Sequence, residues 1–339
     1  MEQKNLTYRK LNKSGTFALT LQLTLAAKLK GARQMKTLFT IITLIALSFA
    51  GVQYANAGNG NNEHSTQTSD TTEGPKLKVL SWNIYMLPPI VARPGKKERA
   101  YAIVEQLKKG EYDVIVFQEA FLHKAREIIS TGLDSIYKYT YGPANSSKPN
   151  IKTSSGVWVI SKTPLRELGQ IEFSTKVGID KWARKGALML EGEFNGNPFQ
   201  VLGTHLQSEN HQDVREKQMD QIYIELISKY KNDGVPQIIC GDMNTENDMK
   251  EHYCHMLNCL DAEDGAMTTS TTNIEVETYD GENNELAQFY GAKKKNTLDY
   301  ILLRANGKKI HSVQRYVSVM KKGKKHLSDH YGVVCEVKF

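Results

Sequence analysis

Residues 113–119 read Asp-Val-Ile-Val-Phe-Gln-Glu, and this stretch decides the fold class of the chain. Its apolar residues follow one another without polar residues between them, which is typical of a strand that is buried on both faces. A helix is predicted just before it, over residues 97–109, where apolar side chains recur at the spacing of one helix face: Ala100, Ile103, Val104 and Leu107. A strand covered on both faces beside an amphipathic helix favours an α/β fold.

The rest of the chain repeats both patterns. A second amphipathic helix is predicted over residues 213–229. Further strands are predicted over residues 77–81, 156–161, 187–191, 199–204, 235–240, 298–303 and 332–339. We therefore expect an α/β fold of two packed mixed β-sheets flanked by helices, a four-layer sandwich that residues 77–339 form as a single domain.

Residues 1–57 are interpreted as a leader. Its signal proper, residues 35–57, has a lysine, then an apolar run, then a small-x-small site, which is the order of a secretory signal peptide. A membrane anchor is the alternative, but the run is shorter than the ~20 apolar residues that a span needs. Residues 1–34 are interpreted as preceding the true start. We therefore expect an exported protein, periplasmic or secreted, with no stable membrane span.

The net charge of +7 also belongs to the leader. Residues 58–339 hold 36 basic and 36 acidic residues, so the exported part is neutral. Affinity for nucleic acid rests on neutralising phosphates, and a neutral chain argues against such a partner. Residues 58–76 are polar and predict a flexible linker to the domain.

Polar residues stand where the predicted strands end. They are Asn83, Glu119, His205, Asp242, Asn244, Asp299, Asp329 and His330. Ligands bind at strand ends in α/β sheets, because the loops there vary while the sheet stays rigid. Carboxylate and amide oxygens suit Mg²⁺, and histidines suit proton transfer near neutral pH. A metal, a base and an acid together are what hydrolysis of a phosphodiester needs.

Several of these motifs resemble one superfamily. The chain has motifs similar to those of the endonuclease/exonuclease/phosphatase superfamily, which has the fold of pancreatic deoxyribonuclease. They are residues 83–87 with 98–100, 156–162, 203–209, 241–244 and 328–330. Within it, the chain most resembles the secreted bacterial neutral sphingomyelinases. The strongest marker is the stretch Gly-Thr-His-Leu-Gln-Ser-Glu at residues 203–209, and Arg215 and Gln218 in the following helix match too.

The resemblance implies a role for each site residue. Glu119 is the main Mg²⁺ ligand, with Mn²⁺ or Co²⁺ as substitutes, and Asn83 supports the same metal or hydrogen-bonds Glu119. His330 is the general base and Asp299 holds its second nitrogen.

The other roles are less specific. Asp242 and Asn244 contact the attacking water, a second metal or the phosphate, and Asp329 is a metal ligand through water. His205 is a phosphate donor or general acid. Lys185 either aids the phosphate or is solvated.

The chain departs from the family at two places. His123 stands where relatives often bind a second, edge metal through Asn, which puts that site in doubt. Relatives also carry an aromatic-tipped hairpin before the last Asp-His that dips into membranes, but residues 317–326 have lysines and no aromatic side chain. We therefore expect weak haemolysis and poor binding to neutral bilayers.

The leading hypothesis is Mg²⁺-dependent hydrolysis of sphingomyelin, or a related phosphosphingolipid, to ceramide and phosphocholine by a monomer at a membrane or micelle surface. The alternatives are a secreted nuclease on the same fold and a catalytically silent toxin or binding module. Export permits disulfides, and Cys254 is close enough in sequence to pair with Cys259. Cys240 and Cys335 are predicted to be buried thiols.

Overall fold

The computed structural model describes residues 74–88, 95–146, 152–270, 274–289 and 291–339. The predicted leader and nearly all of the predicted linker lie outside these residues. The described residues belong to one compact unit. Across this part of the chain, none of the helices combines the length and the apolar character that a membrane crossing requires.

The first sheet has six strands in the order β12-β15-β1-β2-β4-β3. They are β1 (Leu77–Asn83), β2 (Val114–Gln118), β3 (Tyr139–Tyr141), β4 (Trp158–Ser161), β12 (Ser312–Ser318) and β15 (Gly332–Lys338). Only β1 and β2 pair in parallel; the other neighbours are antiparallel. All five residues of β2 are buried, which confirms the prediction from residues 113–117.

The second sheet has five strands in the order β11-β8-β7-β6-β5. They are β5 (Arg166–Glu172), β6 (Gly186–Phe194), β7 (Asn197–His205), β8 (Gln237–Asp242) and β11 (Asp299–Arg304). The pair β7 and β8 is parallel, and the others are antiparallel. Both sheets are therefore mixed, as expected.

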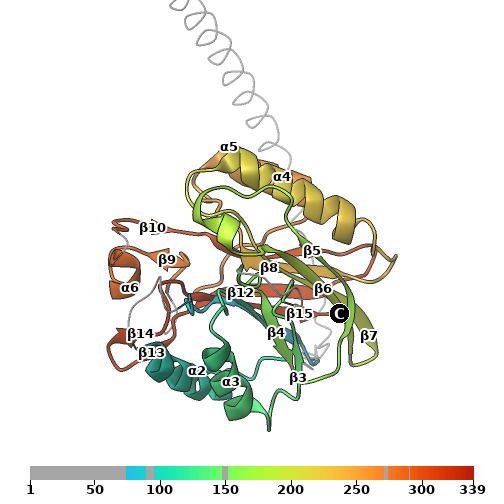
Figure 1. Cartoon of the computed structure of the whole chain (residues 1–339). Helices are drawn as coiled ribbons and strands as arrows, with labels where there is room; N and C mark the ends of the chain where they lie inside the picture. Colours follow the sequence, from blue (N-terminus) through green and yellow to red (C-terminus); the bar gives the residue numbers. More distant parts are fainter. Residues whose placement is uncertain (1–73, 89–94, 147–151, 271–273, 290) are drawn as a thin grey trace, which may run out of the picture. The chain divides into compact units, whose positions relative to one another are not determined.

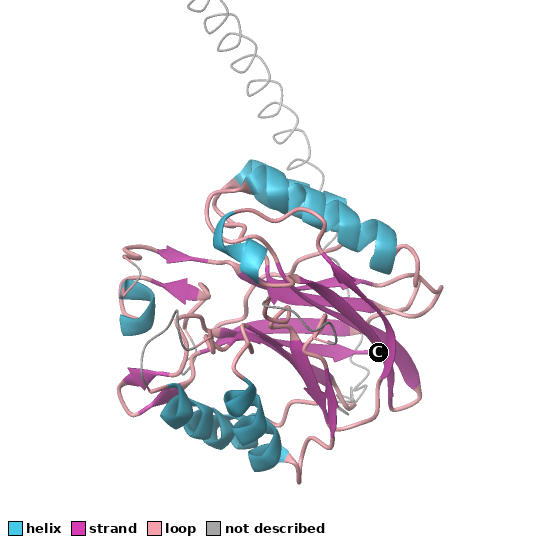
Figure 2. Ribbon diagram, viewed as in Figure 1, coloured by secondary structure: helices cyan, strands magenta, loops and turns pink. Residues whose placement is uncertain are grey.

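Helices cover the outer face of each sheet, which completes the predicted four layers (Figure 1). The first sheet is covered by α2 (Lys96–Gly110) and α3 (His123–Leu133), and the second by α4 (Gln212–Ile222), the π-helical turn η2 (Tyr223–Ile227) and α5 (Lys250–Leu260). One apolar cluster lies between the sheets and one lies under each helix layer. Figure 2 shows the strands between the two helix layers.

The helix predicted over residues 213–229 begins one residue earlier in the structure, at Gln212, and changes from an α-helix to a π-helical turn at Tyr223. From there η2 continues with a wider turn, in which the Ser228 N–H donates to the Tyr223 carbonyl. The wider turn buries the adjacent residues Leu226 and Ile227 together in the outer core of the second sheet. Tertiary packing thus overrides the regular helical period that the sequence indicates.

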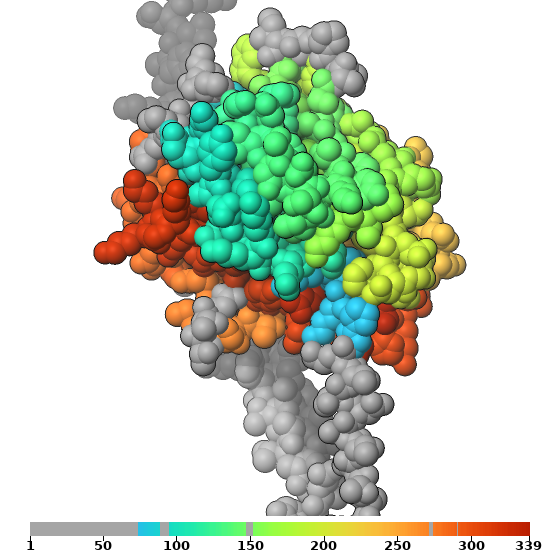
Figure 3. Space-filling view, turned by 90° about the horizontal axis from the view of Figure 1, so that it is seen from below, coloured from blue at the N-terminus to red at the C-terminus, as the bar shows by residue number. Residues whose placement is uncertain are grey.

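Short elements surround the strand ends. They are the 3₁₀ turn η1 (Gly178–Trp182), β9 (Tyr279–Asp280), α6 (Glu285–Gln288), β10 (Lys295–Asn296), and the hairpin of β13 (Lys321–Lys322) and β14 (Lys325–His326). Figure 3 shows the face covered by α2 and α3, with this lysine-rich hairpin, in red, at its edge.

The sheets approach closely at Gly203 in β7. A Cβ atom there would lie 2.7 Å from Val116 Cγ1 and 2.9 Å from Val157 Cγ1, both in the opposite layer. Real Cβ contacts are longer, so only glycine allows this spacing of the two sheets. The glycine before the Thr-His motif therefore has a packing role.

The proposed pairing of Cys254 with Cys259 is wrong, because all four cysteines are free. Both residues lie on α5, five positions apart, and five steps of about 100° leave them on different sides of the helix. Cys240 and Cys335 are buried thiols, as predicted.

Candidate functional site

Strands from both sheets bring the predicted polar residues to one edge. Asn83, His205 and Asp242 are the last residues of β1, β7 and β8. Asp299 is the first residue of β11, and it pairs in register with Asp242 because β11 runs antiparallel to β8. The start of one strand therefore lies beside the end of its neighbour.

Asp242 is the centre of this group. One of its carboxylate oxygens, Oδ2, accepts a hydrogen bond of 3.0 Å from Asn83 Nδ2 and lies 3.4 Å from His205 Nε2 and 3.7 Å from His330 Nε2. Burial alone would raise the pKa of Asp242, but His330 and His205 outweigh it and lower the pKa. Asp242 is therefore a carboxylate at neutral pH.

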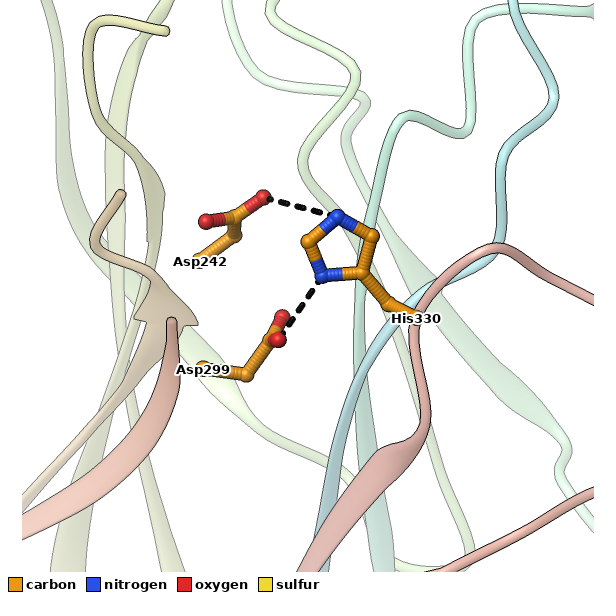
Figure 4. A group of neighbouring side chains, drawn as sticks. All are labelled: Asp242, Asp299 and His330. Carbon is orange, nitrogen blue, oxygen red and sulfur yellow. Dashed lines mark hydrogen bonds and ion pairs between the residues drawn. The ribbon is translucent and has the colours of Figure 1, made fainter. Parts of the chain in front are cut away.

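His330 lies between two carboxylates (Figure 4). Its Nδ1 is 2.8 Å from Asp299 Oδ2, and its Nε2 faces Asp242. Burial lowers the pKa of His330, but the negative charges of Asp299 and Asp242 have a larger, opposite effect. The pKa of His330 therefore lies well above its ordinary value. Asp299 holds one ring nitrogen, which leaves the other directed toward the centre of the site.

Glu119 follows β2 in a left-handed conformation with φ of 53°. Burial, then the nearby charge of Asp329, raises the pKa of Glu119 to about 8. Burial also raises the pKa of Asp329, which accepts a hydrogen bond from Ser328 Oγ at 3.2 Å. A group of close carboxylates thus lies beside His330.

Arg99 supports the backbone on two sides of these carboxylates. Its guanidinium donates to the carbonyls of Ile84 and Tyr85, just after β1, and to that of Leu327, just before the Ser-Asp-His turn. Arg99 lies in the motif at residues 98–100, but the sequence assigned it no role, because its acceptors are backbone carbonyls of two segments that lie far apart in the sequence.

Lys185 is buried, with 3% of its surface exposed, so the solvated alternative is wrong. Its Nζ donates to Asp180 Oδ2 at 2.9 Å and to the Leu206 carbonyl at 3.0 Å, and it lies 3.2 Å from His205 Nε2. Burial, then the charge of Lys185, lowers the pKa of His205 to about 4. His205 is therefore neutral in this arrangement.

The donors at this edge fit a hard divalent cation. Asp242, Asp299 and His330 each offer a ligand atom, and these atoms lie within 4.8 Å of one another. Asp299 Oδ1 is buried and has no hydrogen-bond partner among the described residues. Burial, then the charge of Asp329, raises the pKa of Glu119, and a bound cation would favour its ionised form. Oxygen-rich, electron-rich sites of this kind are typical of Mg²⁺.

Two other predicted residues are already engaged within the chain. Asn83 Oδ1 accepts from the Tyr85 N–H, which is the geometry of an Asx turn, and its Nδ2 donates to Asp242 rather than to Glu119. Asn244, at φ of 48°, donates through Nδ2 to the Leu206 carbonyl. His123 is the first residue of α3.

Sequence reasoning placed Asp180 in a loop that resembles a family loop beside the site but gave it no role, and it missed Tyr279. Asp180 holds Lys185 beside His205. The Tyr279 ring packs against the His330 ring, with 4.8 Å between the ring centroids. Neither residue stands at the end of a predicted strand, and that was the signal which identified the others.

Comparison with known proteins finds one matching family. Residues 80–330 match the model of the endonuclease/exonuclease/phosphatase family. The chain is 30% identical to a sphingomyelinase C of Leptospira interrogans over 71% of this chain and 46% of that protein, so it spans about half of its length. It is 27% identical to a phospholipase C of Staphylococcus aureus, over 75% of this chain and 81% of that protein.

Solved structures share the fold. The sphingomyelinase C from Streptomyces griseocarneus superposes with a TM-score of 0.68 at 24% identity, over 78% of this chain and all of that one. A mutant beta toxin from Staphylococcus aureus with bound magnesium ions gives the same TM-score, identity and coverage.

Proposed function

Because the chain belongs to the endonuclease/exonuclease/phosphatase family, we propose that it hydrolyses the phosphodiester of sphingomyelin, or of a related phosphosphingolipid, to ceramide and phosphocholine. The relatives named sphingomyelinase C and phospholipase C support this substrate class. The observation that carries the chemistry is the placement of His330 between Asp299 and Asp242, beside the carboxylates of Glu119 and Asp329.

His330 is the general base in this proposal. Asp299 fixes its Nδ1, so Nε2 is free to take a proton from water at the centre of the site. His330 must first lose a proton, and the charges of Asp299 and Asp242 stabilise the protonated ring. Hydrolysis therefore requires a pH at which the ring is neutral.

The remaining residues bind and orient. His205 is neutral, so it acts as a hydrogen-bond donor to the phosphate rather than as an imidazolium, and buried Lys185 supplies positive charge beside it. Asp242 and Asn244 orient the water and the phosphate. A Mg²⁺ ion held by Glu119, with Asn83, Asp242 and Asp329, would offset charge on the phosphoryl oxygens. Mn²⁺ or Co²⁺ would substitute.

The proposal includes an exported monomer that meets its lipid transiently at a membrane or micelle surface. A nuclease on the same fold is the second candidate, but the neutral charge of residues 58–339 does not favour binding to nucleic acid. A catalytically silent module is the third candidate, and the pairing of His330 with Asp299 argues against it.

One assay separates the three candidates. The purified protein is incubated with labelled sphingomyelin micelles and with plasmid, each with Mg²⁺ or with a chelator. We expect release of phosphocholine that disappears with the chelator and in His330→Ala, while His311→Ala, at an exposed histidine, behaves as wild type. Nicked plasmid without release of phosphocholine would establish the nuclease. A protein that acts on neither substrate would establish the silent module.

A further inference from the structure

The turn η1 presents two large apolar side chains to solvent. Ile179 is 56% exposed and Trp182 is 65% exposed. They stand three positions apart on a 3₁₀ turn, in which residues i and i+3 lie on the same side. The two side chains therefore form one apolar patch, which we call the Ile179–Trp182 patch.

The patch is fixed to the candidate site. Asp180, between the two residues, is buried, and its Oδ2 accepts from the Ser208 N–H and Oγ and from Lys185 Nζ. Lys185 in turn contacts His205. The patch therefore has a defined position two contacts away from a residue of the site.

A second connection holds the end of the turn. The Thr153 N–H donates to the Trp182 carbonyl, and the Ala183 N–H donates to the Asp180 carbonyl. Because the backbone on both sides of Trp182 is hydrogen-bonded, folding the turn inward to hide the ring would break these bonds. The fold therefore fixes the backbone that presents Trp182 to solvent.

The size and chemistry of the patch indicate what covers it. Two side chains offer only about 300 Å² of apolar surface, far less than the roughly 800 Å² per partner of a stable protein interface. An indole ring is suited to the boundary between lipid and water, where its apolar body and polar N–H are both accommodated. Lys181, exposed between Ile179 and Trp182, suits headgroup phosphates.

We propose that the Ile179–Trp182 patch docks the protein on the surface of a phospholipid bilayer. Insertion of these side chains at the headgroup level holds the neighbouring His205 at the bilayer surface. This inference deepens the proposed function, because it says how the site reaches a lipid substrate. The expected poor binding to neutral bilayers took only the hairpin at residues 317–326 into account, and the proposal replaces that expectation.

The tryptophans of the chain provide a direct readout. Of the three, Trp82 and Trp158 are 1% and 2% exposed, so a quencher in the bilayer reaches Trp182 first. Vesicles of brominated phosphatidylcholine without sphingomyelin are added to the full-length protein in chelator. We expect quenching of the tryptophan fluorescence, and none with soluble bromide at the same concentration.

Variants then test the residues in vesicle sedimentation. We expect Trp182→Ser and Ile179→Ser each to lower the partition coefficient onto phosphatidylcholine vesicles by about tenfold. Ile224→Ser is the matched control, because Ile224 is 67% exposed on η2 in the helix layer, and it should bind as wild type. Thermal unfolding should show no change in Tm for the three variants, since all three side chains are exposed.

Three results would overturn the docking proposal: absence of quenching, equal loss of binding in Ile224→Ser, or a concentration-dependent dimer that Trp182→Ser abolishes. Hydrolysis is followed separately with p-nitrophenyl phosphocholine, which is soluble in water. Trp182→Ser should hydrolyse that ester at the wild-type rate. Its rate of hydrolysis on sphingomyelin vesicles should be about tenfold lower than that of the wild type. A wild-type protein that hydrolyses neither substrate refutes the proposed function, while quenching still decides the docking.

Discussion

His330 Nδ1 lies 2.8 Å from Asp299 Oδ2, although the two residues are contributed by different sheets. Asp299 begins β11 of the second sheet, and His330 lies two residues before the start of β15 of the first. The pair therefore exists only while the two sheets are packed together. Its geometry depends on the apolar cluster between the sheets as much as on the two residues themselves.

Asp299→Asn should move the pH dependence of hydrolysis. The Asp299 carboxylate is the main group that holds the pKa of His330 above its ordinary value against the effect of burial. Without it the pKa falls, so the acid limb of kcat/KM against pH moves to lower pH. The plateau rate falls by about 10²–10³-fold, because the ring loses its orientation. Asp233→Asn, at an exposed aspartate, is the control, and an unmoved acid limb in Asp299→Asn would remove His330 as the base.

Glu119→Gln should remove a loss of stability that develops as the pH rises from 4.5 to about 8. The pKa of Glu119 is raised from 4.5 to about 8, so the folded chain keeps a proton that the unfolded chain releases. In the metal-free protein this stabilisation is complete below pH 4.5 and is lost as pH rises through about 8. Urea unfolding in chelator should show the decline in wild type and a flatter profile in Glu119→Gln.

Glu119→Gln also tests whether Glu119 binds a metal ion. A cation that replaces the proton on Glu119 should raise the Tm of the wild type when Mg²⁺ is added at pH 8. The Tm of Glu119→Gln should hardly respond. An equal response of both proteins would place the metal elsewhere.

Lys185→Met should destabilise the protein by about 3–5 kcal/mol, because it leaves the carboxylate of Asp180 buried without its partner. It should also raise the pKa of His205, which Lys185 depresses together with burial. Urea unfolding measures the first effect and NMR titration of the imidazole the second. Asp180→Asn combined with Lys185→Met should cost less than the sum of the single changes, since the unpaired charge is gone.

Gly203→Ala should cost about 1–3 kcal/mol, because the added methyl group meets Val116 and Val157 of the other layer. Val116→Ala in the same protein should restore part of the loss by making room. Thermal unfolding of the wild type, of Gly203→Ala and of the double variant measures this. If Gly203→Ala alone is as stable as wild type, the sheets are not held as closely as described.

The thiols should react according to their exposure. Cys254 is exposed, whereas Cys240 and Cys335 are buried, and burial raises the pKa of Cys240, Cys259 and Cys335. Ellman's reagent should therefore label Cys254 rapidly and Cys240 and Cys335 only after unfolding. A reductant should leave the Tm unchanged. A shift in Tm on reduction would mean that a disulfide forms after all.

Much of the fold could be predicted, because its signals are local. The apolar run at residues 113–117 and the periodic apolar residues of 97–109 are properties of short segments, and both elements form with shifts of one residue at their ends. The pairing of the strands could not be predicted in the same way. Nothing near β15 indicates that it lies between β1 and β12.

The candidate site divides along the same line. Asp242 follows from its position at the end of β8, and His330 from its position in the turn before β15, since sheets align such positions. The contact of Lys185 with Asp180 and His205, and the three carbonyls that Arg99 holds, depend on loops whose course the sequence does not indicate. The predicted Cys254–Cys259 pairing was wrong because it rested on proximity in sequence alone. In the helix α5 the two side chains lie on different sides.

The position of β15 has a consequence for biosynthesis. Its neighbours in the first sheet are β1, from the start of the domain, and β12. While the ribosome is still translating, β1 has no partner on that side, and the turn that carries His330 is not yet anchored. The turn that carries His330 is therefore anchored only after translation has passed β15.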